Sequence, residues 1–172
     1  VSASDSRFVC ELNVVKTNTE SDIAAFTYYD ELPLVVKYMR GNLVLLTDRY
    51  LRFYDEKDKL LREYSIQSDI SGYSFADDFM MIYSEKNIIG SENEASFYSY
   101  EGGLLTDKEA IRGKINYIDL NGSCALILTN NTVIRFDFAN GEARVCKIDT
   151  GADKALLQSD YTGLVCYVNF AQ

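Results

Sequence analysis

The sequence predicts an all-β fold, a β-propeller or partial propeller built from about four four-stranded antiparallel blades. Short apolar runs begin at intervals of 35 to 45 residues, and residues 43–66 align without a gap on residues 125–148. Between these runs, no apolar stripe at helical spacing is long enough for a substantial helix. Four short strands in about 40 residues is the period of a propeller blade.

The alignment pairs residues of the same chemistry near the ends of the predicted strands. Its matches are Thr47 with Thr129, Tyr54 with Phe136, Asp55 with Asp137, and Ile66 with Ile148. Their separation of 82 residues spans two repeats rather than one, because a further apolar run begins between them, at Phe79.

The predicted strands are short runs rich in Val, Ile, Leu, Tyr and Phe, bounded by Gly, Asn and Asp, as is typical of strands and their turns. Gly102 and Gly103, like Asn140 and Gly141, lie where third and fourth strands must reverse, and both dipeptides suit tight hairpin turns. The most complete repeat has its strands at 32–39, 43–48, 50–56 and 60–66. The second strands of the repeats are predicted at 43–48, 79–85, 124–130 and 164–170.

The interior strands are apolar on both faces, as in LVLL (43–46) and ALIL (125–128). This pattern favours blades stacked face to face, each covering its neighbour. The alternative is a β-sandwich of about 14 strands, which does not explain why the period holds.

The first and last repeats are incomplete. The first contributes only two strands, within residues 7–17 and 22–31, and the last stops after its second strand. We therefore expect residues 1–172 to form a single domain that is part of a longer chain. Because open blades expose strand edges and an apolar face, we also expect self-association through the terminal blades.

Composition narrows the class of protein. The chain has 172 residues, of which 47% are hydrophobic, which is enough for a buried core. Its net charge is −9 and its Lys and Arg residues are scattered, so the sequence predicts no nucleic-acid partner.

The cysteines lie in apolar strand-like runs, where cysteine usually acts as a small buried hydrophobe. They are Cys10, Cys124, Cys146 and Cys166, and the chain has no histidine and no CxxC pair. We expect at least three of them to be buried and none to bind a metal. A disulfide between Cys10 and Cys166 is the expected exception.

The sequence offers little for catalysis. Without histidine, no Ser-His-Asp or Cys-His arrangement exists, and phosphate-binding glycine loops are missing. Acidic residues gather at Asp77 and Asp78 and within residues 55–58, where solvated turns are expected. We therefore predict no catalytic residue, no cofactor and no enzyme. The alternative is a glycoside hydrolase-type enzyme that uses carboxylates at strand ends.

Two connections between second and third strands are predicted to be long, at residues 16–22 and 84–95, whereas those at 48–49 and 130–131 are tight. Long loops on a rigid scaffold commonly carry binding. The candidate binding residues on these loops are Asn18, Glu20, Asn87, Ile88, Ile89 and Glu92.

Three stretches, VSASDSRFVCELNVV, SDIAAFTYYDE and LPLVVKYMRGNLVLLTDRYLRFYD, resemble an uncharacterised Gram-positive family of membrane-anchored, extracellular β-propeller-like proteins that carry a domain of unknown function. The resemblance implies extracytoplasmic placement, with a membrane anchor that lies outside this chain. The Trp-Asp dipeptide of WD repeats is absent, and the lack of any Trp argues against a quinone-cofactor propeller. We therefore predict a non-enzymatic binding or scaffold module that recognises a protein or a cell-envelope glycan.

Overall fold

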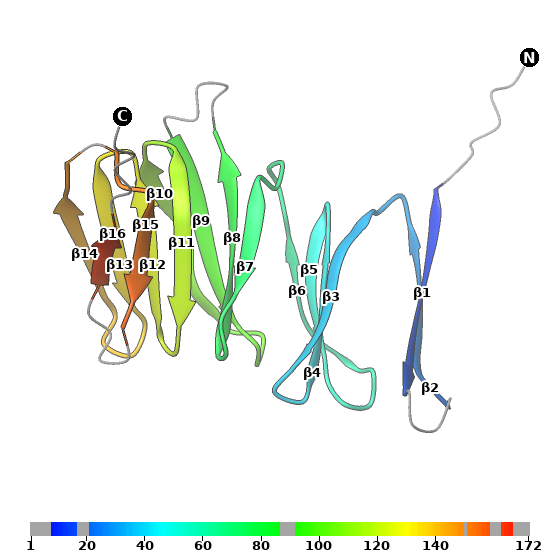
Figure 1. Cartoon of the computed structure of the whole chain (residues 1–172). Helices are drawn as coiled ribbons and strands as arrows, with labels where there is room; N and C mark the ends of the chain where they lie inside the picture. Colours follow the sequence, from blue (N-terminus) through cyan, green and yellow to red (C-terminus); the bar gives the residue numbers. More distant parts are fainter. Residues whose placement is uncertain (1–7, 17–20, 87–91, 150, 159–162, 167–172) are drawn as a thin grey trace, which may run out of the picture. The chain divides into compact units, whose positions relative to one another are not determined.

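The computed structural model is all-β in the part of the chain that it describes, which comprises residues 8–16, 21–86, 92–149, 151–158 and 163–166 (Figure 1). Its strands form three four-stranded and two two-stranded sheets, and every described pairing is antiparallel. The predicted fold class is therefore confirmed, with complete blades in the middle of the chain and partial ones toward its ends.

The strands follow one another in simple meanders. The two-stranded sheets pair β1 (Val9–Lys16) with β2 (Ser21–Tyr29) and β15 (Lys154–Leu157) with β16 (Gly163–Cys166). The first four-stranded sheet holds β3 (Pro33–Met39), β4 (Asn42–Thr47), β5 (Tyr50–Tyr54) and β6 (Leu60–Ser65). The second holds β7 (Gly72–Phe75), β8 (Phe79–Glu85), β9 (Glu92–Ser99) and β10 (Leu104–Arg112). The third holds β11 (Ile115–Asn121), β12 (Cys124–Thr129), β13 (Thr132–Asp137) and β14 (Glu142–Lys147).

The chain divides into two compact units. Unit 1 contains Val1–Ser68 with the turn Tyr100–Gly102, and unit 2 contains Asp69–Ser99 and Gly103–Gln172. Each unit has an apolar core of its own. The prediction that residues 1–172 form a single domain stays a prediction.

In unit 1, the sheet β1–β2 packs against the sheet β3–β6. The core between them contains Leu43 and Leu45 from β4, with Tyr28 and Tyr54 beside them. Phe26 and Tyr54 have ring centroids only 4.6 Å apart, so aromatic packing joins the two sheets.

The packing of the sheets in unit 2 distinguishes the predicted propeller from the alternative β-sandwich. All six residues of β12 are buried. Ala125 and Ile127 pack into the core shared with β7–β10, whereas Leu126 and Leu128 pack with Ala155 of the β15–β16 sheet. The sheet β11–β14 is thus covered on both faces, which gives three stacked layers (Figure 1). A two-layer sandwich does not have this arrangement.

The residues matched in the repeat stabilise the turns. The hydroxyl oxygen of Thr47 accepts the N–H of Tyr50 at 2.9 Å, and that of Thr129 accepts the N–H of Thr132 at 3.2 Å. Asp55 and Asp137 each use one carboxylate oxygen to accept two backbone N–H groups of the hairpin that follows. The repeat is visible in the sequence because each turn needs the same local hydrogen bonds.

The predicted strand positions agree closely with the structure. Three of the predicted second strands correspond to β4, β8 and β12 within one residue at each end. The fourth begins as β16, and residues 167–170 lie outside the described part of the chain. The acidic residues 55–58 and 77–78 lie between strands, as predicted. The long connection predicted at 84–95 is shorter, because β8 extends to Glu85 and β9 begins at Glu92.

The prediction about cysteine burial is wrong. Cys124 is buried, but Cys10 is only half-buried and carries a free thiol, and Cys146 is exposed. Cys146 belongs to β14, the outermost strand of its sheet, and all six residues of that strand are exposed. An apolar sequence run therefore does not guarantee burial at a sheet edge. The side chain of Cys166 lies outside the described residues.

Candidate functional site

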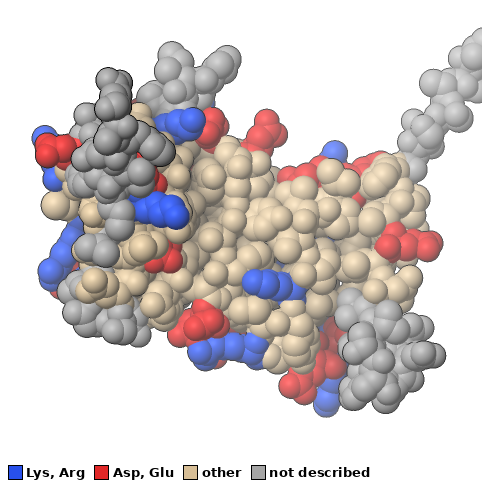
Figure 2. Space-filling view, in the orientation of Figure 1, with Lys and Arg blue, Asp and Glu red and all other residues tan. Residues whose placement is uncertain are grey.

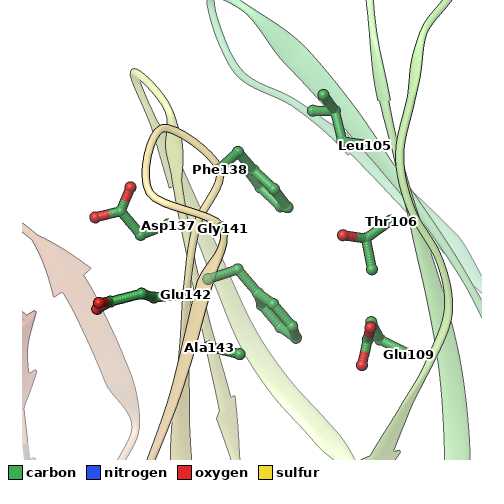
Figure 3. A pocket seen from close by; sticks show the side chains of 9 residues that line it. Leu105, Thr106, Glu109, Asp137, Phe138, Gly141, Glu142 and Ala143 are labelled. Carbon is green, nitrogen blue, oxygen red and sulfur yellow. The ribbon is translucent and has the colours of Figure 1, made fainter.

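Unit 2 contains a groove between β10 and the β13–β14 hairpin, with a volume of about 150 Å³ (Figure 3). Among the described residues, no basic side chain lines it. The lining residues are Leu105, Thr106, Glu109, Phe136, Asp137, Phe138, Gly141, Glu142 and Ala143.

One wall of the groove is aromatic. Phe136 and Phe138 are two residues apart, so they share one face of the strand and its extension. Their rings are stacked, with 3° between the planes and 6.2 Å between the centroids. Phe79 and Phe97 lie behind Phe138, with centroids 4.9 and 4.8 Å from its ring. This four-ring cluster belongs to the core and makes the wall rigid.

Asp137, between the two phenylalanines, points away from the cavity (Figure 3). One of its oxygens accepts the backbone N–H groups of Ala139 and Asn140, and the other accepts Arg135 Nη2 and Asn140 Nδ2, both at 3.0 Å. Glu142 also points away, and it accepts Arg144 Nη2 at 2.8 Å. These two carboxylates stabilise the β13–β14 hairpin and do not point into the cavity.

The opposite wall is the irregular strand β10. Its register with β9 shifts twice, around Thr106. Lys108 adopts a φ of 52°, and its N–H donates to Ser96 Oγ at 3.1 Å. Bulges of this kind redirect side chains. Thr106 and Glu109 are placed across the cavity from Phe138 (Figure 3).

The groove thus combines stacked aromatic rings, a hydroxyl and one exposed carboxylate, that of Glu109. An Arg or Lys side chain fits this combination, because its methylene stem packs on aromatic faces and its charge is attracted by the ring and by the carboxylate. On the face shown in Figure 2, basic and acidic side chains are dispersed among the other residues.

The groove does not supply what the hydrolase alternative requires. Glycoside cleavage needs two carboxyl groups that flank the scissile bond. Of the three acids that line this groove, only Glu109 is available, because Asp137 and Glu142 point away from it. Among the described residues, no group of three or more Cys, Asp or Glu side chains is arranged to hold a metal ion.

A second group of polar residues lies in unit 1, around the buried Arg52. Its Nη1 and Nη2 donate to the two carboxylate oxygens of Glu31 at 2.6 and 2.9 Å, and its Nε donates to Glu63 at 2.6 Å. The rings of Tyr28 and Tyr50 lie against the guanidinium, with centroids 5.0 and 4.5 Å away. All three guanidinium nitrogens are engaged, so we interpret this group as structural.

The ionisation of this group reflects its packing. Burial disfavours the charged form of Arg52, but hydrogen bonds to Glu31 and Glu63 outweigh this effect and raise its pKa. The pKa of Tyr28 is raised by burial first and by its hydrogen bond with Tyr54 second. The two hydroxyl oxygens are 3.1 Å apart.

Unit 1 also has an open hollow of about 340 Å³ near Glu31. The carboxylates of its two aspartates already accept backbone hydrogen bonds. Asp30 accepts one from the N–H of Phe8 at 3.1 Å, and Asp48 accepts one from the N–H of Leu32 at 2.7 Å. We therefore give the groove of unit 2 priority as the candidate site.

Of the loop residues predicted to bind a partner, only Glu92 is described, and it is not among the residues that line this groove. Glu92 is the exposed first residue of β9 and pairs with Arg112. Asn18, Glu20, Asn87, Ile88 and Ile89 lie outside the described residues, so their role stays a prediction. The sequence analysis missed Thr106, Glu109, Phe136 and Phe138. The alternation in FDF (136–138) was the available signal, since it places two aromatic rings on one face.

Comparison with known proteins supports the fold. No family model and no curated protein matches this chain by sequence. The structure is similar to that of KlAtg21 in complex with the coiled coil of AgAtg16, with a TM-score of 0.61, 14% identity, and coverage of 91% of this chain and 56% of that one.

Two further solved structures are similar. Hsv2 from Kluyveromyces lactis has a TM-score of 0.53 and 12% identity, and the match covers 90% of this chain and 51% of that one. HIRA(644-1017) has a TM-score of 0.53 and 14% identity, and the match covers 78% and 49%. The likeness to such β-propeller proteins shows the fold alone. The chain spans about half the length of the structures that it resembles.

Proposed function

We propose that this chain is a non-enzymatic binding module of the β-propeller type. Its groove between β10 and the β13–β14 hairpin binds an extended segment of a protein partner through an Arg or Lys side chain. The observation that carries this proposal is the position of the Glu109 carboxylate opposite a wall of stacked phenylalanine rings.

Charge supports a basic partner segment. The whole chain carries a net charge of −9, and the groove has an exposed acid and no base. A cation against an aromatic ring contributes roughly 0.5–2 kcal/mol, depending on its desolvation. A protein partner is also consistent with one similar structure, that of KlAtg21, which was solved with a coiled coil bound.

A cell-envelope glycan is the competing ligand, because aromatic faces also bind sugar rings. A neutral glycan, however, has no cation to pair with Glu109 and could use this carboxylate only as a hydrogen-bond acceptor for its hydroxyl groups. We further propose that the full-length protein is membrane-anchored and extracytoplasmic, which rests on the family resemblance. Protease treatment of intact cells tests this placement: release of the propeller supports it, and full protection contradicts it. In the described part of the chain, no helix is long and apolar enough to cross a membrane.

The groove is tested with an array of random decapeptides that carry Arg, Lys or Gln at one fixed position. We expect the purified chain to bind the Arg and Lys sets and to bind the Gln set about tenfold more weakly. Glu109→Gln and Phe138→Ala should each weaken binding of the Arg and Lys sets by about tenfold. Glu85→Gln is the matched control, because Glu85 is an exposed acid of the same unit that is not among the residues lining the groove, and it should leave binding unchanged.

Two results would contradict the proposal. One is equal loss of binding in Glu85→Gln and Glu109→Gln, which would indicate a general charge effect. The other is the absence of peptide binding together with binding to a cell-wall glycan array that Phe138→Ala abolishes. The second result would assign the same groove to a glycan.

A further inference from the structure

The outer strand of the third sheet, β14, borders the groove. Gly141, Glu142 and Ala143 line the cavity at the start of this strand. Among the described strands, β14 pairs with β13 alone, so its other edge is open. An open edge presents backbone N–H and C=O groups that can pair with another chain.

The hydrogen-bonding pattern shows which residues face the open edge. The N–H of Ile148 donates to the carbonyl oxygen of Asn131 at 3.0 Å, and the register continues without a shift to the pair Asp137↔Glu142. Hydrogen-bonded pairs alternate along antiparallel strands. The backbone groups of Glu142, Arg144 and Cys146 therefore bond to β13, and those of Ala143, Val145 and Lys147 point to the open edge.

The side chains of these edge-facing residues lie on the groove side of the sheet. Ala143 is opposite Phe136 and lines the groove. Val145 is two residues further on the same face, opposite Ile134, and 67% of its surface is exposed. The groove side of β14 therefore continues from Ala143 to the exposed Val145 and ends at Lys147, beside backbone groups that point away from β13.

The outer strands β6 and β10 differ from β14 in the regularity of their pairing, whereas β14 itself carries the charged residues Glu142, Arg144 and Lys147. The register of β6 shifts once, between Phe53 and Tyr54, and that of β10 shifts twice. The register of β14 is regular. At the position of Val145, β6 has Glu63, as the alignment of the repeats shows. Bulges and charges are the usual means of blocking edge pairing.

We propose that the basic partner segment adds to the open edge of β14 as a fifth strand, so that every second side chain enters the groove. This inference rests on the proposed function and specifies its binding mode. The backbone groups of residues 143, 145 and 147 supply the hydrogen bonds, and the aromatic wall with Glu109 selects the basic side chain.

A proline substitution tests the protein side of this interface. Val145→Pro removes an N–H that points to the open edge and is not needed for β13, so the fold should remain, as edge strands tolerate such a proline. We expect Val145→Pro to bind the Arg and Lys peptides at least about tenfold more weakly. Val145→Thr is the matched control, because it keeps the N–H and should bind almost normally. Circular dichroism and thermal unfolding verify the fold.

Backbone methylation of the best-binding peptide tests the partner side with the unaltered protein. Methylation of each amide in turn should weaken binding about tenfold or more at every second position and have little effect in between. This peptide series also tests strand addition if the Val145→Pro variant fails to fold. Tolerance at all positions, or loss without alternation, would overturn strand addition.

The outcomes separate the two proposals. If Glu109→Gln and Phe138→Ala weaken binding but Val145→Pro and the methylated peptides do not, the groove binds a side chain without strand addition. If the chain instead forms dimers that Val145→Pro dissociates in light scattering, the edge serves a second copy and the partner-segment proposal is wrong.

Discussion

The sheets β3–β6 and β11–β14 are two copies of one repeat that have a different type of residue at one aligned core position. Arg52 in the first sheet aligns with Ile134 in the second, and both are 7% exposed. Their cross-strand partners are Glu63 and Val145, respectively. The same backbone position is therefore filled by an ion pair in unit 1 and by an apolar pair in unit 2.

This difference has consequences for the outer strands. The buried charge of Arg52 is balanced by carboxylates, and one of them is Glu63 on β6. The outer strand β6 is therefore charged at this position. Ile134 needs none because it joins the apolar core, and β14 is left with an exposed valine at the equivalent place. The residue at this one core position therefore goes together with a charged cross-strand partner on β6 and an apolar one on β14.

The largest expected effect comes from placing the residue of unit 2 into unit 1. Arg52→Ile leaves the buried Glu31 carboxylate without its cationic partner, although the Thr47 hydroxyl still donates to it at 3.1 Å. The removal of one member of a buried ion pair typically costs about 3–5 kcal/mol. Urea unfolding followed by circular dichroism measures this loss, and hydrogen exchange should locate it in β3–β6.

Glu63→Gln is the control for this variant. The Glu63 side chain is 40% exposed, so solvent already screens its ion pair and the loss should stay below about 1 kcal/mol. If Arg52→Ile were as stable as the natural chain, an apolar residue could replace the arginine at this position at no cost in the free energy of unfolding. The difference between the two units would then not contribute to stability.

A smaller effect is expected from the aspartates that both sheets share. Asp137 is 8% exposed and accepts four hydrogen bonds from three residues, so Asp137→Ala should destabilise unit 2 by about 1–3 kcal/mol. Asp55→Ala should cost clearly less, because Asp55 is more exposed and accepts only two backbone N–H groups. Comparison of the two variants by thermal unfolding checks the order, and the reverse order would contradict it.

The smallest effect is expected at alkaline pH. Burial raises the pKa of Tyr28 and of Tyr54 above the usual value of 10.0, so the folded state retains protons that the unfolded state releases. This contribution to stability is complete below about pH 10 and decreases as the pH rises further.

In unit 2, burial likewise raises the pKa of Tyr83, which lies on β8 and not in the sheet β11–β14. We therefore expect β3–β6 to lose hydrogen-exchange protection at a lower pH than β11–β14. Tyr28→Phe should reduce this difference, because it removes one of the two coupled hydroxyl groups. Equal alkaline sensitivity of the two sheets would argue against the interpretation.

Much of the fold could be predicted because its determinants are local. Thr47 and Thr129 stabilise tight turns between adjacent strands, and Asp55 and Asp137 stabilise the next hairpin, so each repeat specifies its own meander. The runs LVLL and ALIL indicated strands covered on both faces, and the burial of β4 and β12 agrees. The error about Cys146 arose where this reasoning was applied to an outer strand.

The candidate groove could not be predicted in the same way, because its two walls come from different sheets. Thr106 and Glu109 are placed by the bulged strand β10, and Phe138 follows β13 about 30 residues later. Likewise, Glu31, which precedes β3, meets Arg52 in the middle of β5.

The sequence by itself determined the repeat, the strands and the turns, since these depend on hydrogen bonds between near neighbours and on alternation along a strand. Only the tertiary structure decided which phenylalanines form a wall, which acids turn away from it and which outer strand borders the groove. The physical reason is that these properties arise when sheets stack face to face, which brings side chains together whose contact no short stretch of sequence specifies.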